Sequence, residues 1–511
     1  MNSKTENDMK RKLLWILALM QVGVCHAEDI TVRYQGATAK VNQKLKDSVS
    51  VTVDGASVHI ESLYRDRKLT LRLTGKSEDG RLTLKTAGKA KVTLDGLTLT
   101  SQEGAPLDLK NKKKVEVAVA KGTENTLTIT ACKDTANHKA AAIWSKDKLL
   151  LSGKGVLNVV ATGDGCRGVK TKKDITIEEL TLNVKTSGNH LGEKPFGFGG
   201  FPGFGNGEMP DFSKFSPFGN DSIRPGGFPS MPNFGGFPPF GNDSIRPGGF
   251  PSFGNDSIQA GGFPPFGNDS TMQGGFGGKH KYVASTKGIA SKGRITINSG
   301  NVTVRTSTAG AEGIEGKQGI VFNGGTVDVL TPDDAINSNA TIEFNGANVI
   351  ARSMGNDAVD ANPEGGFFPF SGNGGQKIEP AIIVRGGTVY AWSQVGPPEE
   401  GLDSDMAPLA IEGGTVFTVG GSISDMPSVP TNETAKQPTI LFIGLDIVKD
   451  EPIGIYNASG KLIDTVTVPF SFRRSASLVS SPAFKLGSTY TVKTKGQEKT
   501  FTLSETFTVV R

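Results

Sequence analysis

The feature that most constrains the fold is a short repeat of strand-like runs between residues 294 and 417. Each copy has a short β-rich run, a small-residue turn, a second β-rich run and a polar corner. Aliphatic and polar residues alternate within each run, which is the period of a strand with one buried face. The five clearest copies lie at 294–304, 320–329, 341–350, 381–390 and 409–417, and looser ones lie at 91–100, 149–159 and 174–184.

The spacing of this repeat selects the architecture. Aligning the aliphatic residue after each corner gives Ile289, Ile314, Ile336 and Val359, which are 25, 22 and 23 residues apart. A fixed period in this range is typical of a solenoid or a propeller, but propeller blades need about 40 residues or more and four strands. A leucine-rich repeat pattern is absent. The sequence therefore predicts an all-β parallel β-helix, whose coils each add a strand to every sheet; an antiparallel sandwich is the alternative.

Composition divides the mature chain into four segments. We expect N-terminal coils over residues 28–187, an insertion over 188–279, C-terminal coils with acidic corners over 280–421, and a β-rich C-terminal cap over 422–511. The insertion is rich in Gly, Phe, Pro and Asn, and repeats Phe-Gly-Asn-Asp from Phe218, Phe240, Phe253 and Phe266. Dense Gly and Pro preclude a regular ladder. It is either a spacer or a binding element whose phenylalanines stack on sugar rings.

The N-terminus indicates export. A basic triplet at residues 10–12 precedes an apolar stretch at 13–24, and Cys25, His26 and Ala27 follow. This pattern predicts a signal peptide over residues 1–27, cleaved to leave a mature chain starting near Glu28. The apolar stretch is shorter than the roughly 20 residues of a membrane span. We expect a monomer without a transmembrane segment in the periplasm, at the cell surface or outside the cell, with a lipid on Cys25 as an alternative.

Charge and cysteine content exclude some functions. Removing residues 1–27 takes away four bases and two acids, so the formal net charge falls from +5 to +3. Such a small excess gives no case for a nucleic-acid partner. Cys132 and Cys166 remain, which permits one disulfide or two separate thiols, and argues against a thiolate metal cluster.

The polar corners predict a metal site. In register, the corner of each coil places Glu312, Asp334, Asp357 and Glu400 in one column and Glu315, Asn337, Asp360 and Asp403 in a second, with Asp333 beside them. Stacked coils lie about 4.8 Å apart, and carboxylates at that spacing repel unless their pKa values rise or a cation is shared. Calcium fits, because it takes six to eight oxygen ligands in flexible geometry. The alternative is a solvated acidic edge.

Upstream corners carry bases instead. Arg167, Lys170 and Lys287 occupy the corner positions that carry acids in later coils. A basic stretch beside a calcium-loaded acidic one would suit a polyanionic sugar, because bases pair with uronate carboxylates and calcium bridges them to protein. Arg305 and Arg352 are further substrate-binding candidates, and would supply the base of a lyase. The alternative is that these lysines are ordinary solvated surface.

Several motifs resemble a known family, the secreted calcium-containing β-helix carbohydrate-binding proteins of anaerobic bacteria. The resemblance rests on residues 94–107 (LDGLTLTSQEGAPL), on 125–128 (NTLT), on repeated Gly-Gly-Thr-Val corners followed by DDAIN at 333–337, and on 478–491. It implies a right-handed parallel β-helix of pectate-lyase-like architecture, calcium on acidic corners, and binding of cellulose or pectic polymers. The basic early corners and the long insertion depart from the family pattern.

These observations favour a secreted, calcium-dependent polysaccharide-binding protein without catalysis. A calcium-dependent polysaccharide lyase and a cell-surface adhesin or structural protein are the alternatives. The columns offer many carboxylate pairs, but none is singled out for glycoside hydrolysis, and fold analogy alone is a weak basis for assigning chemistry.

Overall fold

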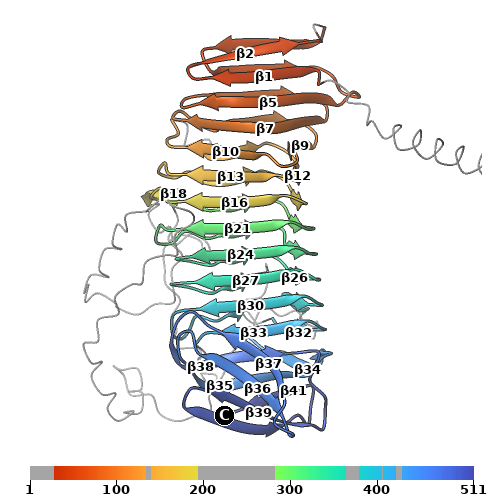
Figure 1. Ribbon diagram of the computed structural model, residues 1–511, viewed down its shortest axis with the longest axis vertical. Coiled ribbons are helices and arrows are strands. Elements are labelled where there is room, and N and C mark those ends of the chain that lie inside the picture. The colour runs from red at the N-terminus through yellow and green to blue at the C-terminus, as the bar shows by residue number, and fades with distance from the viewer. Residues whose placement is uncertain are drawn as a thin grey trace, which may run out of the picture. The chain divides into compact units, whose positions relative to one another are not determined.

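The protein is all-β over the residues that the computed structural model describes, which are 28–45, 47–133, 140–193, 282–363, 379–404, 407–421 and 428–511. The signal peptide predicted for residues 1–27 and nearly all of the insertion lie outside these residues. Strands stack coil upon coil from the N-terminal end to a β-rich C-terminal part (Figure 1). The predicted parallel β-helix with a C-terminal cap is confirmed. Within the described residues no helix is long and apolar enough to cross a membrane.

An 11-stranded sheet forms one side of the solenoid, and its strands are parallel except for the first pair. From the N-terminal end it contains β3 (Val49–Asp54), β4 (Ser57–Ser62), β6 (Arg81–Thr86), β8 (Leu107–Asn111), β11 (Ala141–Ser145), β14 (Arg167–Thr171), β19 (Ile289–Ser291), β22 (Ile314–Gly316), β25 (Ile336–Ser338), β28 (Val359–Ala361) and β31 (Leu402–Asp403).

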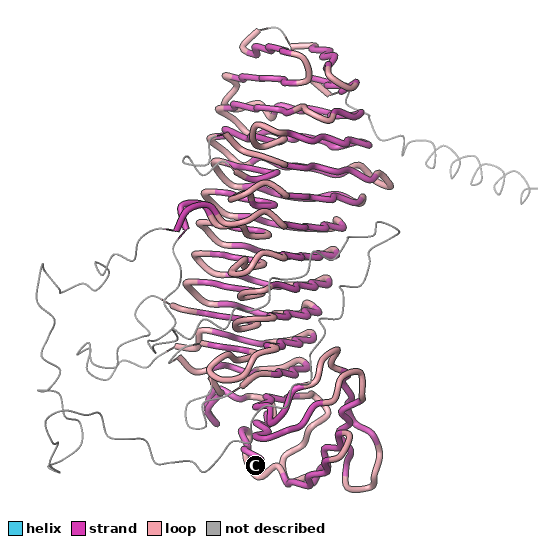
Figure 2. The backbone as a smooth tube through the Cα atoms, turned by 90° about the vertical axis from the view of Figure 1, so that its left-hand side faces the viewer, coloured by secondary structure: helices cyan, strands magenta, loops and turns pink. Residues whose placement is uncertain are grey.

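A 24-stranded sheet supplies the other two sides of each coil. Its first limb contains β9 (Val115–Val119), β12 (Leu149–Gly153), β15 (Ile175–Glu178), β20 (Ile295–Ile297), β23 (Ile320–Phe322), β26 (Ile342–Phe344), β29 (Ile382–Val384), β32 (Leu409–Ile411) and β34 (Pro430–Ala435). Its second limb contains β10 (Glu124–Ile129), β13 (Val156–Ala161), β16 (Thr181–Thr186), β21 (Asn301–Thr306), β24 (Thr326–Thr331), β27 (Asn348–Ser353), β30 (Thr388–Ser393) and β33 (Thr415–Val419). The long strands β5 (Leu69–Ser77) and β7 (Ala90–Ser101) precede both limbs, and β7 pairs with β9 and with β10. Figure 2 shows these ladders joined by short loops.

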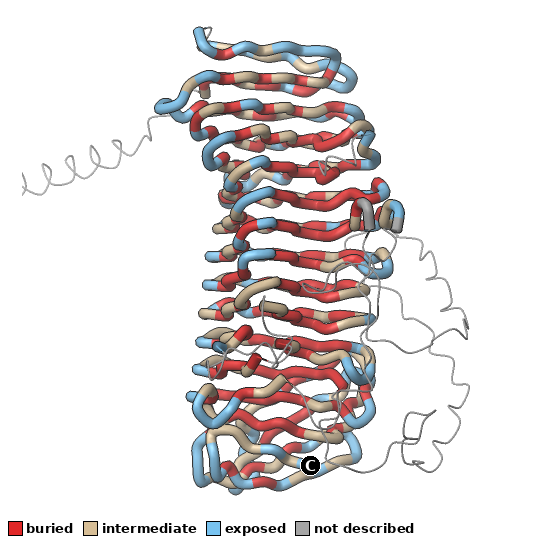
Figure 3. Tube along the Cα trace, turned by 180° about the vertical axis from the view of Figure 1, so that it is seen from behind, coloured by how far each residue is buried: buried red, intermediate tan, exposed pale blue. Residues whose placement is uncertain are grey.

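The coil register follows the predicted repeat. Ile289 pairs with Ile314, Ile314 with Ile336, and Ile336 with Val359. These side chains are fully buried, as are the alternate aliphatic residues of the other strands. Figure 3 shows buried residues along the strands of successive coils. Phe322 and Phe344 stack inside successive coils with ring centroids 5.0 Å apart. Each strand is too short to be stable alone, so this continuous core holds the coils together.

An antiparallel hairpin covers the N-terminal end of the solenoid, and mainly antiparallel strands cover the C-terminal end. At the N-terminal end β1 (Ile30–Gln35) pairs with β2 (Thr38–Gln43) as an antiparallel hairpin. At the other end, the antiparallel strand β38 (Phe472–Ser480) pairs with β33 and with β35 (Thr439–Ile447), and β35 also pairs with β41 (Phe507–Val510). A four-stranded antiparallel sheet contains β36 (Pro452–Asn457), β37 (Leu462–Thr467), β39 (Thr489–Thr494) and β40 (Gln497–Thr502).

The cap does more than close the last coil. A second hydrophobic core joins Trp392 and Phe417, which lie on strands of the last coils, to Phe442, Ile455 and Val479 of the cap. Trp392 packs edge-on against Phe470 with ring centroids 6.4 Å apart. The cap therefore also covers an outer face of the final coils. Before the insertion, β17 (Leu191–Glu193) pairs with β18 (Tyr282–Ala284), which joins the two flanks of that segment.

Candidate functional site

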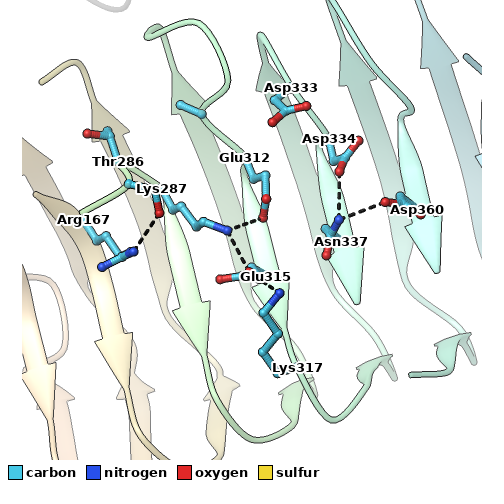
Figure 4. Close-up of polar contacts among 12 residues, drawn as sticks. Arg167, Thr286, Lys287, Glu312, Glu315, Lys317, Asp333, Asp334, Asn337 and Asp360 are labelled. Atoms are coloured by element: carbon cyan, nitrogen blue, oxygen red, sulfur yellow. Dashed lines mark hydrogen bonds and ion pairs between the residues drawn. The ribbon is translucent and has the colours of Figure 1, made fainter. Parts of the chain in front are cut away.

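Two columns of polar residues run along the 11-stranded sheet at its corner (Figure 4). In the first column, backbone N–H groups of the neighbouring coil donate to the carbonyls of Lys287, Glu312, Asp334, Asp357 and Glu400, at 3.0 to 3.4 Å. In the second column, Ala290 pairs with Glu315, Glu315 with Asn337, Asn337 with Asp360, and Asp360 with Asp403. The register predicted for both columns is confirmed, and Arg167 precedes Lys287 in the first.

The basic end of the columns holds two buried cations that lack carboxylate partners among the described residues. Arg167 is 8% exposed, and its Nη2 donates to Ser285 Oγ at 2.8 Å. Its Nε and Nη1 are buried and have no acceptor within the described ranges. Lys170 is 6% exposed, and burial, together with the nearby Arg167, lowers its pKa to about 6. Among the described residues, this corner therefore has spare hydrogen-bond donors on Arg167.

Lys287 is not free to bind a ligand, because it lies between two glutamates (Figure 4). Its Nζ is 2.7 Å from Glu312 Oε2 and 2.7 Å from Glu315 Oε1. Lys317 Nζ lies 2.6 Å from the same Glu315 oxygen. Burial alone would lower the pKa of Lys287, but the two glutamates outweigh it and raise that pKa. Within the first acidic coil the charges are therefore already compensated by lysines.

Beyond Glu315, amide and backbone N–H groups contact the corner carboxylates. Asn337 Nδ2 donates to Asp334 Oδ2 at 2.8 Å and to Asp360 Oδ2 at 2.9 Å, so one amide links two carboxylates of adjacent coils (Figure 4). Asp334 is 2% exposed, and no donor from the described part of the chain reaches its buried Oδ1. Burial, and then the charge of Asp360, raise the pKa of Asp334 well above its ordinary value.

The next two coils continue this pattern. Burial, and then Asp403, raise the pKa of Asp357, although the backbone N–H of Glu400 donates to Asp357 Oδ1 at 2.5 Å. Burial raises the pKa of Glu400 to about 8, despite a 2.9 Å hydrogen bond from the backbone N–H of Ser428. Ser428 Oγ also donates to Asp403 Oδ1 at 3.0 Å. Asp333 Oδ1 accepts from Asn356 Nδ2 at 2.7 Å.

The residues from Asp334 onward supply oxygen atoms, the donor type that a hard cation prefers. As placed, the described residues contain no group of three His, Cys, Asp or Glu side chains that could hold a metal ion. Asn337, however, lies between two carboxylates, and rotating its amide by 180° would aim Oδ1 instead of Nδ2 at the space beside Asp334 and Asp360. Two carboxylates, an amide oxygen and corner carbonyls are oxygen donors of the type that calcium binds.

Arg305 and Arg352 lie on another part of the solenoid. They belong to β21 and β27 of the 24-stranded sheet, whereas the corner columns belong to the 11-stranded sheet. Arg305 Nη2 and Arg352 Nη2 bind the two oxygens of Asp328 at 2.5 and 2.6 Å. The structure does not bring them together with the corner residues, and their assignment to substrate stays a prediction.

Sequence reasoning missed several residues that complete the corners. Lys317 shares Glu315 with Lys287, Asn362 Nδ2 donates to Asp360 Oδ1 at 2.5 Å, and Ser428 binds Glu400 and Asp403. Asn362 and Lys317 lie two residues after a column position, and this common spacing is a signal that could have found them. Ser428 follows a gap in the repeat and gives no such signal.

Comparison with known proteins finds similarity to carbohydrate-binding domain-containing proteins. Residues 54–194 and 268–360 match the model of a family described as carbohydrate-binding domain-containing protein. A protein of the same description from Acetivibrio thermocellus is 31% identical over 160 residues, which cover 29% of this chain and 55% of the relative, so the match spans about half of that relative's length. A solved structure, described as a polysaccharide lyase-like protein from C. thermocellum in a gadolinium derivative, aligns with a TM-score of 0.37 at 16% identity, over 66% of this chain and 92% of that one. The chain is thus similar to carbohydrate-binding domain proteins in both halves of its β-helix.

Proposed function

We propose that this protein is an exported, non-catalytic polysaccharide-binding protein that holds acidic glycan chains along the corner columns, with calcium at the acidic end. The proposal draws on the match to a carbohydrate-binding domain family and on the signal-peptide pattern of residues 1–27. Nothing in the match specifies which polysaccharide is bound. The choice of an acidic glycan comes from the side chains of the corner.

One observation carries the choice, namely the buried guanidinium of Arg167 with two nitrogens that lack acceptors, next to Lys170. Leaving a buried charged donor unsatisfied costs a few kcal/mol, so Arg167 favours an acceptor from outside the described residues, and a ligand carboxylate would supply one. A planar carboxylate matches the guanidinium fork. Its negative charge would also favour protonation of Lys170, whose ammonium would then add a second charge-assisted contact. Uronic acid units carry that carboxylate.

Calcium has a separate role in this proposal. Asp334, Asp357 and Glu400 are buried carboxyl groups whose pKa values burial raises, so at neutral pH the acidic end favours either protons or a cation. Bound calcium would let these groups ionise and would offer a positive site to a second uronate. Asp333, Asp334, Asn337, Asp357, Asp360, Glu400 and Asp403 are the side chains that would hold it. Glu312 and Glu315 already have lysine partners.

Calorimetry with galacturonate oligosaccharides tests the basic end. Replacing Lys170 by Met should weaken binding about tenfold or more, since a hydrogen bond to a charged group contributes ~1.5–3 kcal/mol. Lys172→Met is the matched control, because Lys172 is an exposed lysine just beyond the same strand. Unchanged affinity in the Lys170 variant, or an equal loss in the Lys172 variant, would overturn the assignment.

Calcium is tested independently of sugar. Titrating calcium into protein freed of metal should release or absorb heat and raise the unfolding temperature, and the double variant D334N/D360N should lose both effects. The control is Asp328→Asn, since Asp328 lies on the other sheet with two arginine partners. Absence of any calcium effect on the wild-type protein would show that the metal assignment is wrong. The proposed binding of acidic glycans near Arg167 would not be affected by that result.

A further inference from the structure

A polar groove crosses the first coils of the 11-stranded sheet, away from the acidic corners. It has a volume of about 420 Å³, within the size range of small-ligand sites. Its floor is one outward-facing column in which His59 pairs with Thr83 and Thr83 with Asp108. Thr52 stands opposite His59 on β3 and extends the column by one strand. Arg81, Glu103 and Ala105 line the groove as well.

The lining suits a ligand rich in hydroxyl groups and without net charge. Acids and bases are nearly balanced, because Asp54, Glu103 and Asp108 face Arg81 and Lys110. Two of these acids are paired within the groove, Glu103 with Arg81 and Asp108 with Lys110, both at 3.3 Å. Lys133 also contacts Glu103, so the groove offers no net charge that would attract a polyanion. Threonine hydroxyls and the imidazole of His59, by contrast, donate and accept hydrogen bonds without charge.

The direction of the groove suits an extended chain. Its floor residues come from successive strands about 4.8 Å apart, and a β-linked pyranose chain advances by a similar distance for each sugar. One polar side chain can therefore meet one sugar unit in each coil. A peptide added as a strand is excluded here, because β4, β6 and β8 are each paired on both edges.

We propose, resting on the polysaccharide binding proposed above, that this groove is a second glycan site that takes neutral β-linked chains without calcium. His59, Thr83 and Asp108 contact the sugar hydroxyls, and Ala105 packs against a sugar C–H face. The two sites divide the ligands by charge, with acidic units bound near Arg167 and neutral units bound near Thr83. The solenoid thereby binds two kinds of chain along one sheet.

Calorimetry in EDTA with the neutral hexasaccharides of β-1,4-linked glucose, xylose and mannose tests this site in the full chain. At least one should bind the wild-type protein. Thr83→Trp fills the groove and should weaken that binding at least about tenfold, which corresponds to ~1.4 kcal/mol. Thr98→Trp is the matched control, since Thr98 is a half-buried, outward-facing threonine on β7 of the other sheet. His59→Ala should cost about threefold to tenfold, as for one neutral hydrogen bond.

Failure of the neutral-glycan groove can be distinguished from failure of the acidic-glycan site near Arg167. If no hexasaccharide binds in EDTA, or if the Thr98 variant loses as much affinity as the Thr83 variant, the groove is not a glycan site. Unchanged affinity in both the Thr83 and His59 variants would overturn it as well. Galacturonate binding should survive in the Thr83 variant, so failure of neutral binding alone leaves the acidic site in place.

Discussion

Replacing Lys287 by Met tests how much the buried ion pairs of Lys287 with Glu312 and Glu315 stabilise the fold. The Lys287 ammonium lies 2.7 Å from carboxylate oxygens of both Glu312 and Glu315, and its side chain is only 10% exposed. Methionine keeps much of the length and removes the charge. Removing one member of a buried ion pair typically costs ~3–5 kcal/mol, because the partner charge stays buried without compensation. We expect a loss of that size for the coil that contains Glu312.

Lys317→Met provides the matched control. Lys317 contacts the same Glu315 oxygen at 2.6 Å, but its side chain is 42% exposed. Exposed ion pairs contribute only about 0–1 kcal/mol. The two variants remove the same functional group from the same carboxylate and differ mainly in burial, so any large difference between them comes from desolvation.

The pH dependence gives a second readout. In the wild-type protein burial would raise the pKa of Glu315, but Lys287 and then Lys317 lower it to about 2. Without Lys287, burial should dominate and the folded-state pKa values of Glu312 and Glu315 should lie above their unfolded values. The folded variant then holds protons that the unfolded chain releases, so its stability falls as pH rises. The difference from wild type should therefore grow from about pH 5 to pH 8.

Denaturant unfolding and local amide exchange would measure this effect. Solenoids can open coil by coil, so exchange at residues 312–317 reports the relevant unfolding better than a single global midpoint. The triple variant K287M/E312Q/E315Q should recover most of the lost free energy of unfolding, since it removes the buried carboxylates that Lys287 no longer compensates. Equal costs for the Lys287 and Lys317 variants, or a cost independent of pH, would refute the reasoning.

Three further predictions concern other parts of the chain. Because burial raises the pKa of Glu400 from 4.5 to about 8, metal-free protein should lose stability as pH rises across that interval, and Glu400→Gln should flatten the dependence of unfolding temperature on pH measured in EDTA. Phe322→Ala removes one ring of the internal stack with Phe344 and should cost ~3–5 kcal/mol in denaturant unfolding. Val321→Ala should cost less, because Val321 is buried outside that internal core and loses fewer carbon atoms. Trp392→Ala should loosen the contact between the last coils and the cap. Amide exchange should then become faster in β36–β39 and stay unchanged in β5–β7. Unchanged exchange in the cap would contradict the shared core.

Much of the fold could be predicted from the sequence because the signals are local. Strand alternation identifies the buried face of each run, and the spacing of Ile289, Ile314, Ile336 and Val359 sets the register between coils. A shift by one residue would turn every aliphatic side chain outward, so the register is strongly specified. The corner columns follow directly, since they are tied to the same register.

The candidate site could be predicted only in part, because side-chain partners are not fixed by register. Lys287 was expected to face a ligand, yet it reaches into the next coil and binds two glutamates. Arg305 and Arg352 are predicted to contact substrate, and in the structure they bind Asp328 on the 24-stranded sheet. In both cases the choice of partner depends on rotamers and on burial produced by neighbouring coils.

The sequence by itself determined the coil, its period and the order of charges along its corner, because each of these depends on residues close together in the chain. Only the tertiary structure decided which charges cancel and which stay uncompensated. It also decided that the cap shares a core with Trp392 and that His59, Thr83 and Asp108 form the floor of a groove. These features join residues that are far apart in sequence, and the free energy of burying a charge or an aromatic ring depends on every neighbour that packing brings to it.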